Sequence, residues 1–408
     1  MNDQVQAQYE ALPYPARDPA DEAKRLVTGS PSHWPELLHH LFAGRTPKEP
    51  MRILVAGCGT GDALVMLAQQ TADAGVDAAI TGLDLSEASI ALARARLAAR
   101  GLEDRVRIER RSLLEAPEIA AAEGPFDYID CCGVLHHLDE PAAGFRALAE
   151  SLAPQGGLGL MVYAEFGRSG VYELQESLRR LAPEDLPPDE RIAVARRVLA
   201  ALPATNRFRR NPLLKDHLDS EAGLYDLLLH STDRAYRADR LLTEIESAGL
   251  ALVTWIDPLR YDPALYLPAQ EGRAAQRMIP GARAALAEAL AGNMRKHILY
   301  ATRAERPAPS APGLTPEAIP VWRDAETMRL FHAMPKGART LPLTIDGLQI
   351  SCPLPEGAAD LARLIDGKRN LEKIRRHLPD RPDKATFKAR IEAFWRPTNG
   401  FSKLFVKR

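Results

Sequence analysis

The stretch Ile53-Leu54-Val55-Ala56-Gly57-Cys58-Gly59-Thr60-Gly61-Asp62 decides the fold. It begins as an apolar run, ends in glycines at alternate positions, and is followed by a helix-like run over 63–70. This order predicts a strand, a tight turn and a helix. Because glycine lacks a Cβ atom, a ligand can lie against the backbone of the turn, and the first amides of the helix then point at that ligand.

An acidic residue follows the next apolar run. Residues 78–83 are apolar and end at Asp84, where a carboxylate at the tip of a second strand commonly binds ribose hydroxyls. The glycines differ from the Gly-x-Gly-x-x-Gly pattern of dinucleotide-binding proteins, and Asp62 is a poor neighbour for a pyrophosphate. Gly-x-Gly-x-Gly followed by an acid after the second strand resembles class I S-adenosylmethionine (SAM) methyltransferases.

Two later stretches extend this resemblance. Phe126-Asp127-Tyr128-Ile129, followed by Val134-Leu135-His136-His137-Leu138, closely resembles the family motif that lines the space between methyl donor and acceptor. Ser112 and Leu113 stand where the family often has an acid for the adenine amine and an apolar residue for the ring. Many relatives also carry an acid two residues before the first glycine. Here that position is Val55, and Asp62 can take part of the role.

The resemblance implies that SAM binds here and leaves as S-adenosyl-L-homocysteine. The expected cofactor contacts come from the turn, from the tips of the second and third strands, and from the turn after the fourth strand. They are Gly57, Cys58, Gly59, Thr60, Gly61, Asp62, Asp84, Leu85, Ser112, Leu113, Gly133, Val134 and His137.

Methyl transfer from a sulfonium is an in-line displacement, in which alignment alone can contribute on the order of 7–11 kcal/mol. A strong base is therefore optional. The candidates for a catalytic role are His136, His137, Tyr163 and His230. Asp226 to Tyr236, which follows a short apolar helix, is expected to face the pocket. The four cysteines are too few and too scattered to predict a zinc site or a disulfide framework, so no metal is expected.

Alternation of strands and helices over 51–163 predicts a parallel sheet with helices on both faces. We expect strands at 52–56, 78–83, 105–109, 126–131 and 157–163, and later strands at 250–256 and 297–303. The resulting fold class is α/β, with a doubly wound, mostly parallel seven-stranded sheet, helical insertions, and a small α+β C-terminal domain. Substrate-recognition insertions are expected at about 165–236 and 263–295.

The remaining segments flank this core, 51–303. Residues 1–50 are expected to form a lid or arm that carries Tyr9 and Tyr14, with the proline-rich part from Tyr9 to Pro19 extended. Residues 304–320 read as a proline-rich linker. Asp346-Gly347 between apolar runs predicts a hairpin in a winged-helix-like or peptide-binding module over 321–408.

The totals limit the partners. The chain of 408 residues has a net charge of −1, so no global field attracts nucleic acid or anionic lipid. No stretch is long and apolar enough to predict a membrane span, and no signal segment is recognised, so a cytoplasmic location is expected. A peptide, protein or small-molecule acceptor is favoured, and the oligomeric state stays open.

Three alternatives stay open at this point. An RNA methyltransferase would use the basic residues Arg207, Arg209 and Arg210 and the basic tail. A non-catalytic SAM-binding or interaction protein would bind the cofactor without turnover. A dehydrogenase would bind a nicotinamide cofactor in the same turn, although Asp62 and the Val-Leu-His-His-Leu stretch argue against it.

Overall fold

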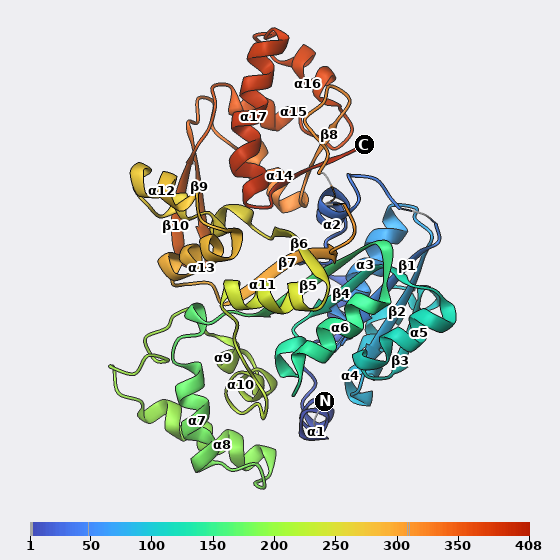
Figure 1. Cartoon of the computed structure of the whole chain (residues 1–408), viewed down its shortest axis with the longest axis vertical. Helices are drawn as coiled ribbons and strands as arrows, with labels where there is room; N and C mark the ends of the chain where they lie inside the picture. Colours follow the sequence, from blue (N-terminus) through green and yellow to red (C-terminus); the bar gives the residue numbers. More distant parts are fainter. Residues whose placement is uncertain (1–2, 48, 308, 310) are drawn as a thin grey trace.

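The computed structural model describes residues 3–47, 49–307, 309 and 311–408. The other positions of the expected arm and linker lie outside the described residues. The centre is a seven-stranded sheet in the order β3-β2-β1-β4-β5-β7-β6 (Figure 1). Its strands are β1 (Met51–Ala56), β2 (Ala78–Asp84), β3 (Val106–Arg110), β4 (Phe126–Cys132), β5 (Leu152–Tyr163), β6 (Leu250–Trp255) and β7 (Lys296–Arg303).

The pairing confirms the expected α/β, doubly wound class. β1 pairs in parallel with both β2 and β4, and β2–β3 and β4–β5 are also parallel. β7 lies antiparallel between β5 and β6. The strand order therefore reverses between β1 and β4, which is where ligands bind in open α/β sheets.

Helices cover both faces of the sheet. The apolar sides of α2 (Trp34–Leu41), α3 (Asp62–Asp73) and α4 (Glu87–Ala98) share one core with one face. The opposite face packs against α5 (Ala116–Glu123), α6 (Pro141–Ser151), α11 (Ala238–Ser247) and α13 (Pro280–Ala291). Short 3-10 turns complete this part of the chain: η1 (Pro19–Ala23), η2 (Glu103–Arg105), η3 (Leu113–Glu115), η4 (Leu135–His137), η5 (Phe166–Arg168), η6 (Pro258–Tyr261) and η7 (Pro263–Leu265).

A helical block follows β5 and has a small core of its own. It contains α7 (Val171–Leu181), α8 (Pro188–Ala201), α9 (Asp216–Asp219) and α10 (Glu221–Leu228). Figure 1 shows α7 and α8 projecting at one end of the molecule, with α9 and α10 between them and the sheet. The shorter α12 (Ala269–Ala275) precedes α13 between β6 and β7. Both helical segments fall within the ranges expected for insertions.

The C-terminal segment forms a separate apolar core. A hairpin joins β9 (Thr340–Ile345) to β10 (Leu348–Pro353), and β8 (Ile319–Trp322) pairs antiparallel with β11 (Leu404–Lys407). The helices are α14 (Ala325–His332), α15 (Ala358–Leu364), α16 (Leu371–His377) and α17 (Lys384–Gly400). We call 319–407 the terminal module; Figure 1 shows it at the opposite end of the molecule from α7 and α8.

The structure corrects two local expectations. Tyr9 was expected in an extended segment, but it lies in helix α1 (Asp3–Ala11), because the first proline comes only at Pro13 and restricts only the residue before it. β8 was missed, since residues 304–320, which include its proline Pro320, were read as a proline-rich linker. The strand is a two-stranded edge, where proline is tolerated.

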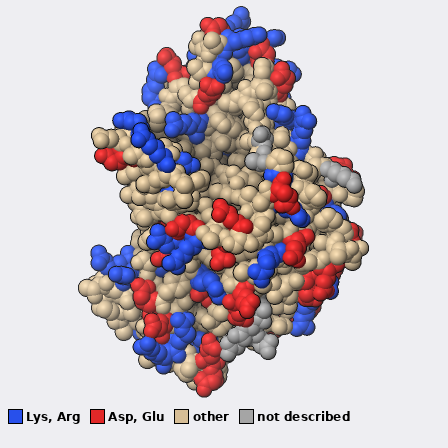
Figure 2. Space-filling model, viewed as in Figure 1, with Lys and Arg blue, Asp and Glu red and all other residues tan. Residues whose placement is uncertain are grey.

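The helices of the described residues include none with both the length and the apolar character that crossing a bilayer requires. Figure 2 shows basic and acidic side chains intermixed over the visible face, without one sign dominating it.

Candidate active site

The glycine turn after β1 is shaped by backbone requirements. Gly57 and Gly61 have φ of +77° and +96°, which other residues rarely adopt. A Cβ atom on Gly57 would lie 2.4 Å from Cγ2 of Val134, and one on Gly61 would lie 2.9 Å from Cβ of Ala93. At Gly59 the nearest atom would be 3.4 Å away, so the middle of the turn has room above it. The two outer glycines of the turn are thus closely packed, whereas the middle one, Gly59, is not.

Asp84 fastens this turn to the neighbouring strand. Its Oδ2 accepts a hydrogen bond from the Gly59 amide at 2.7 Å, and its Oδ1 accepts one from the Ser86 amide at 3.0 Å. Burial raises the pKa of Asp84, and the amides of Ser86 and Gly59 act in the other direction. The carboxylate therefore both orders the turn and presents oxygen atoms beside it.

A cavity of about 480 Å³ lies over the carboxyl ends of the strands. Most of the residues expected at the cofactor line it: Gly57, Cys58, Gly59, Thr60, Asp62, Asp84, Leu85, Leu113, Gly133, Val134 and His137. Gly61 instead packs against Ala93, and the Ser112 hydroxyl accepts a hydrogen bond from the Leu114 amide as a helix cap. Gly61 and Ser112 therefore support the cavity wall without lining the cavity.

The N-terminal arm contributes much of the cavity surface. Tyr9 and Tyr14 both line it, as does the segment 27–32 that leads into α2. The Ser86 hydroxyl donates to the Tyr9 carbonyl at 3.0 Å, and the Thr60 hydroxyl donates to the Pro15 carbonyl at 2.8 Å. These bonds fasten the arm directly onto the glycine turn and the β2 tip.

Asp62 lines the cavity but is already paired. Its oxygens accept hydrogen bonds from Arg17 at 2.9 and 2.6 Å and from Arg96 at 2.7 Å. Arg96 is buried and also pairs with Glu22 at 2.6 Å. Although burial of Asp62 opposes it, this pairing holds the pKa of Asp62 below its ordinary value. Asp62 consequently anchors the arm to α3.

The other end of the cavity is built by side chains from distant segments. Asp226 of α10 is buried and accepts hydrogen bonds from the hydroxyls of Tyr9 at 2.8 Å and Tyr163 at 3.1 Å. Burial raises the pKa of Asp226. The ring of Tyr163 carries the guanidinium of Arg168 at 3.7 Å from its centroid. All four of these side chains line the cavity; of the segment from Asp226 to Tyr236, which was expected to face it, Asp226 and Leu227 do so.

His137 and His230 stack with their ring centroids 3.9 Å apart, and their hydrogen bonds define their tautomers. His137 Nδ1 lies 2.9 Å from the Thr232 carbonyl, which only accepts, so Nδ1 carries the hydrogen and Nε2 keeps a lone pair. His230 Nδ1 accepts from the Thr232 amide at 3.1 Å, and its Nε2 lies 3.3 Å from the Tyr9 hydroxyl. Both ring nitrogens of His230 therefore have hydrogen-bond partners, whereas Nε2 of His137 accepts no hydrogen bond from the described residues.

Parts of this chain are similar in sequence to known proteins. Residues 54–158 match a family described as "Methyltransferase domain". An uncharacterized protein of Synechococcus sp. is 34% identical over 264 residues, which are 64% of this chain and 61% of that protein. The ubiquinone biosynthesis O-methyltransferase of Bordetella avium is 34% identical over 142 residues, 34% of this chain and 52% of that enzyme. The chain thus spans about half to three fifths of these relatives.

A solved structure resembles nearly the whole chain. PKMT2 from Rickettsia typhi, in complex with AdoHcy, superposes with a TM-score of 0.64 over 92% of this chain and 76% of that one, at 15% identity. At this identity the likeness concerns the fold. The strand order, the turn and the matched family agree with one another. Residues 54–158 form a class I methyltransferase domain. The cofactor of this family is SAM, as the glycine turn and Asp84 indicated.

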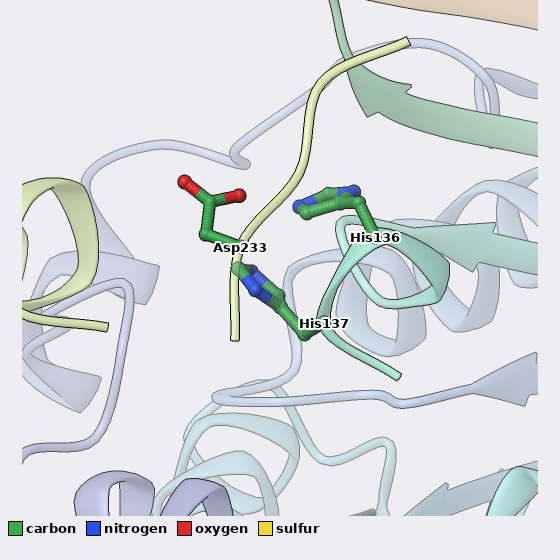
Figure 3. Close-up of side chains that lie close together, drawn as sticks. All are labelled: His136, His137 and Asp233. Carbon is green, nitrogen blue, oxygen red and sulfur yellow. The ribbon is translucent and has the colours of Figure 1, made fainter. Parts of the chain in front are cut away.

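Two groups of described residues could hold a metal ion. In one, His137, Asp226 and His230, the ring nitrogens of His230 and the oxygens of Asp226 are occupied by the hydrogen bonds described above. In the other, His136 and His137 project from the short turn η4 toward the segment that carries Asp233 (Figure 3). Two histidines and a carboxylate suit a transition metal, but Arg168 already pairs with Asp233 at 2.9 Å and opposes a second cation.

The predicted catalytic residues occupy different places. His137 and Tyr163 line the cavity. His136 is buried behind His137, with its ring centroid 4.0 Å from that of Tyr163, and burial lowers its pKa well below the ordinary value. His230 is buried on the far side of His137, and burial lowers its pKa as well. Their catalytic roles stay predictions.

Several further cavity residues were not predicted from the sequence. They are Arg17, Ser32, Met66, Asp130, Met161, Asp216, Arg295 and Lys296. Their separation along the chain hides them, because each meets the cavity only through the fold. Asp130 alone had a local cue: it is a carboxylate inside an otherwise apolar strand.

Proposed function

We propose that this protein transfers the methyl group of SAM to a nucleophile on a peptide or protein side chain or on a small molecule. The observation that carries the proposal is the division of one cavity into two ends. One end is the glycine turn with Asp84, and the other is the polar cluster of Asp226, Tyr163 and His137. A cofactor and an acceptor can therefore meet in one enclosed space.

The reaction needs alignment and, for a protonated nucleophile, a proton acceptor. Transfer occurs by in-line displacement, so the walls contribute mainly by fixing the approach of the acceptor and excluding water. We assign His137 as the proton acceptor because it lines the cavity and has a free Nε2. The Thr232 carbonyl fixes its tautomer, and the stacked ring of His230 fixes its plane.

Apart from His137, the acceptor end is supplied by parts of the chain outside the matched family region. Asp226 and Arg168 lie beyond residues 54–158, as does the arm. The ubiquinone-pathway relatives match between 25% and 37% of this chain, so their names do not define its acceptor. The mixed charges of the visible face support a peptide or small molecule over RNA (Figure 2).

Radiolabelled SAM incubated with extract of cells that lack this gene tests the proposal. We expect wild-type protein to label one fraction, which protease treatment or size separation assigns to protein or small molecule and mass spectrometry identifies. An Asp84→Ala variant, which should not bind the cofactor, is the matched control.

Other outcomes separate the alternatives. Label removed by ribonuclease would indicate an RNA methyltransferase. Binding of S-adenosyl-L-homocysteine without any labelled product would indicate a non-catalytic SAM-binding protein. Binding of reduced nicotinamide cofactor, measured by fluorescence, would indicate a dehydrogenase.

A further inference from the structure

Five carboxylates line the cavity, and they differ in their burial and in how many groups donate hydrogen bonds to them. They are Asp62, Asp84, Asp130, Asp216 and Asp226. Asp62 has two arginines, Asp84 has two backbone amides, and Asp226 has two tyrosine hydroxyls. Asp216 is only half-buried and also meets the Tyr14 hydroxyl, at 3.4 Å. Four of the five are thus stabilised by the protein or reached by water.

Asp130 is the exception. It is 2% exposed, and its partner among the described residues is the Ser32 hydroxyl, which donates to Oδ2 at 2.5 Å. The described part of the chain offers it no ion pair. Burial raises the pKa of Asp130 to about 7, against the smaller opposing effect of Ser32. A buried carboxylate without a cation is costly unless a ligand supplies one.

The position of Asp130 is also informative. In the register between β1 and β4, Asp130 is the partner of Val55, two residues before the first glycine of the turn. It therefore lies at the centre of the sheet, where the strand order reverses. Val55, Asp130 and Ser32 all line the cavity, so the carboxylate belongs to the floor beside the turn.

The chemistry of SAM supplies the missing cation. One end of the molecule is an adenosine, whose ribose suits Asp84 at the tip of β2. The other end is an α-amino acid that carries an ammonium group. A ligand held at β2 and crossing the turn of β1 brings its far end over β4, the next strand. An ammonium group there would meet Asp130.

We propose that Asp130 binds the α-ammonium group of SAM. This inference rests on the proposed function, since it assigns a contact to the same cofactor. Val55 contributes only apolar surface, and the carboxylate comes from the adjacent strand at the same level. Ser32 orients it from the N-terminal arm. The hydrogen bond from Ser32 to Asp130 thereby connects the N-terminal arm to the amino-acid end of the bound cofactor.

Calorimetry with two ligands tests the assignment. S-adenosyl-L-homocysteine has the ammonium group, whereas 5′-methylthioadenosine keeps the adenosine and the thioether but lacks the amino-acid end. We expect Asp130→Asn to weaken the first ligand by about 30-fold or more, as for truncation of a buried charge pair. The second ligand should change by less than threefold. Glu288→Gln, at a fully buried carboxylate that does not line the cavity, is the matched control and should leave both affinities within threefold.

Folding is followed in the same samples. Asparagine keeps the acceptor for Ser32 and removes a buried charge, so thermal unfolding of the unliganded Asp130→Asn variant should occur no lower than in the wild type. If that variant fails to fold, Ser32→Ala gives a second measurement, with an expected three- to tenfold loss confined to S-adenosyl-L-homocysteine. Adding Val55→Asp to Asp130→Asn moves the carboxylate to β1 and should restore part of the affinity.

The outcomes are distinguishable. Equal losses for both ligands, or no loss for either, would overturn the role of Asp130 while leaving SAM binding intact. Lost methyl transfer with unchanged affinity would make Asp130 a catalytic group and would also overturn it. A wild-type protein that binds neither ligand would instead remove the proposed function itself.

Discussion

The two ends of the cavity are built in different ways. At the cofactor end, the backbone of the glycine turn forms the surface, and neighbouring amides hold Asp84. At the acceptor end, the surface is a network of side chains from α1, β5 and α10 around Asp226. The cofactor end therefore depends on local chain geometry, whereas the acceptor end depends on how distant segments pack. Substitutions should therefore separate binding from transfer.

The strongest expected separation is at His137. His137→Gln keeps the size and a donor but removes the free ring nitrogen, so methyl transfer should fall by about 10²–10⁴-fold, the usual worth of a general base. Affinity for S-adenosyl-L-homocysteine should fall much less. Label transfer to extract and calorimetry measure the two effects. An unchanged rate would show that the displacement needs alignment alone.

Asp84→Ala should act in the opposite way. It removes the acceptor for two amides and the expected partner of the ribose, so affinity for S-adenosyl-L-homocysteine should fall about 100-fold or more. The free energy of unfolding should also fall, by about 1–3 kcal/mol, because the Gly59 and Ser86 amides lose their acceptor. Asp73→Ala at the exposed end of α3 is the control. Near-normal affinity would contradict the placement of the cofactor.

His230 joins the acceptor end to the arm. His230→Ala leaves the Thr232 amide without its acceptor and removes the ring that stacks on His137. We expect the free energy of unfolding to fall by about 1–3 kcal/mol, the cost of leaving a buried polar group unpaired. Urea unfolding measures this change. A stable variant with no transfer activity would instead make His230 a direct participant in the chemistry.

A smaller effect is expected from pH. The folded pKa of Asp130, about 7, exceeds the ordinary value of 3.8, so folding favours the protonated form, and stability is lost as pH rises toward and through 7. The nearby Tyr128, Cys131 and Cys132 have pKa values raised further, so they stay neutral over this range. Between pH 6 and 8 the unliganded protein should lose about 1 kcal/mol relative to Asp130→Asn. Parallel unfolding curves for the two proteins would contradict this.

The smallest effect is expected at the hairpin tip of the terminal module. Asp346 pairs with Arg260 at 3.0 Å and with Arg295 at 3.2 Å, and Arg295 lines the cavity. Asp346→Ala should lower the free energy of unfolding by about 1 kcal/mol or less and leave S-adenosyl-L-homocysteine binding unchanged. Thermal unfolding and calorimetry measure both. Asp360→Ala, in a partly exposed pair within α15, is the control.

Most residues at the glycine-turn end of the cavity could be predicted from the sequence, because they are close together and each position has a local reason. Gly57 requires its positive φ, and Asp84 stands at a fixed distance after the turn. The acceptor end could be predicted only in part. The segment from Asp226 was recognised, but its pairing with Tyr9 joins residues 217 positions apart. No pattern in a single sequence specifies that contact, because it arises from packing of the insertion against the arm.

Asp62 and Asp130 show the same limit for charged residues. Asp62 was expected to serve the cofactor because it follows the third glycine, but the fold brings two arginines to it from segments on either side. Asp130 reads as one acid inside an apolar strand. Asp130 is notable because the described residues give it no ion-pair partner. Neither the composition nor the spacing of the sequence predicts that.

The terminal module also has a consequence for how this protein can be divided. Arg323 pairs with the fully buried Glu36 of α2 at 3.2 Å and donates to the Ser30 hydroxyl at 2.9 Å, two residues before Ser32. A chain shortened at residue 303 would strand the Glu36 charge inside the protein and loosen the arm where it meets Asp130. The core, 51–303, and the terminal module should therefore be expressed and purified as one chain.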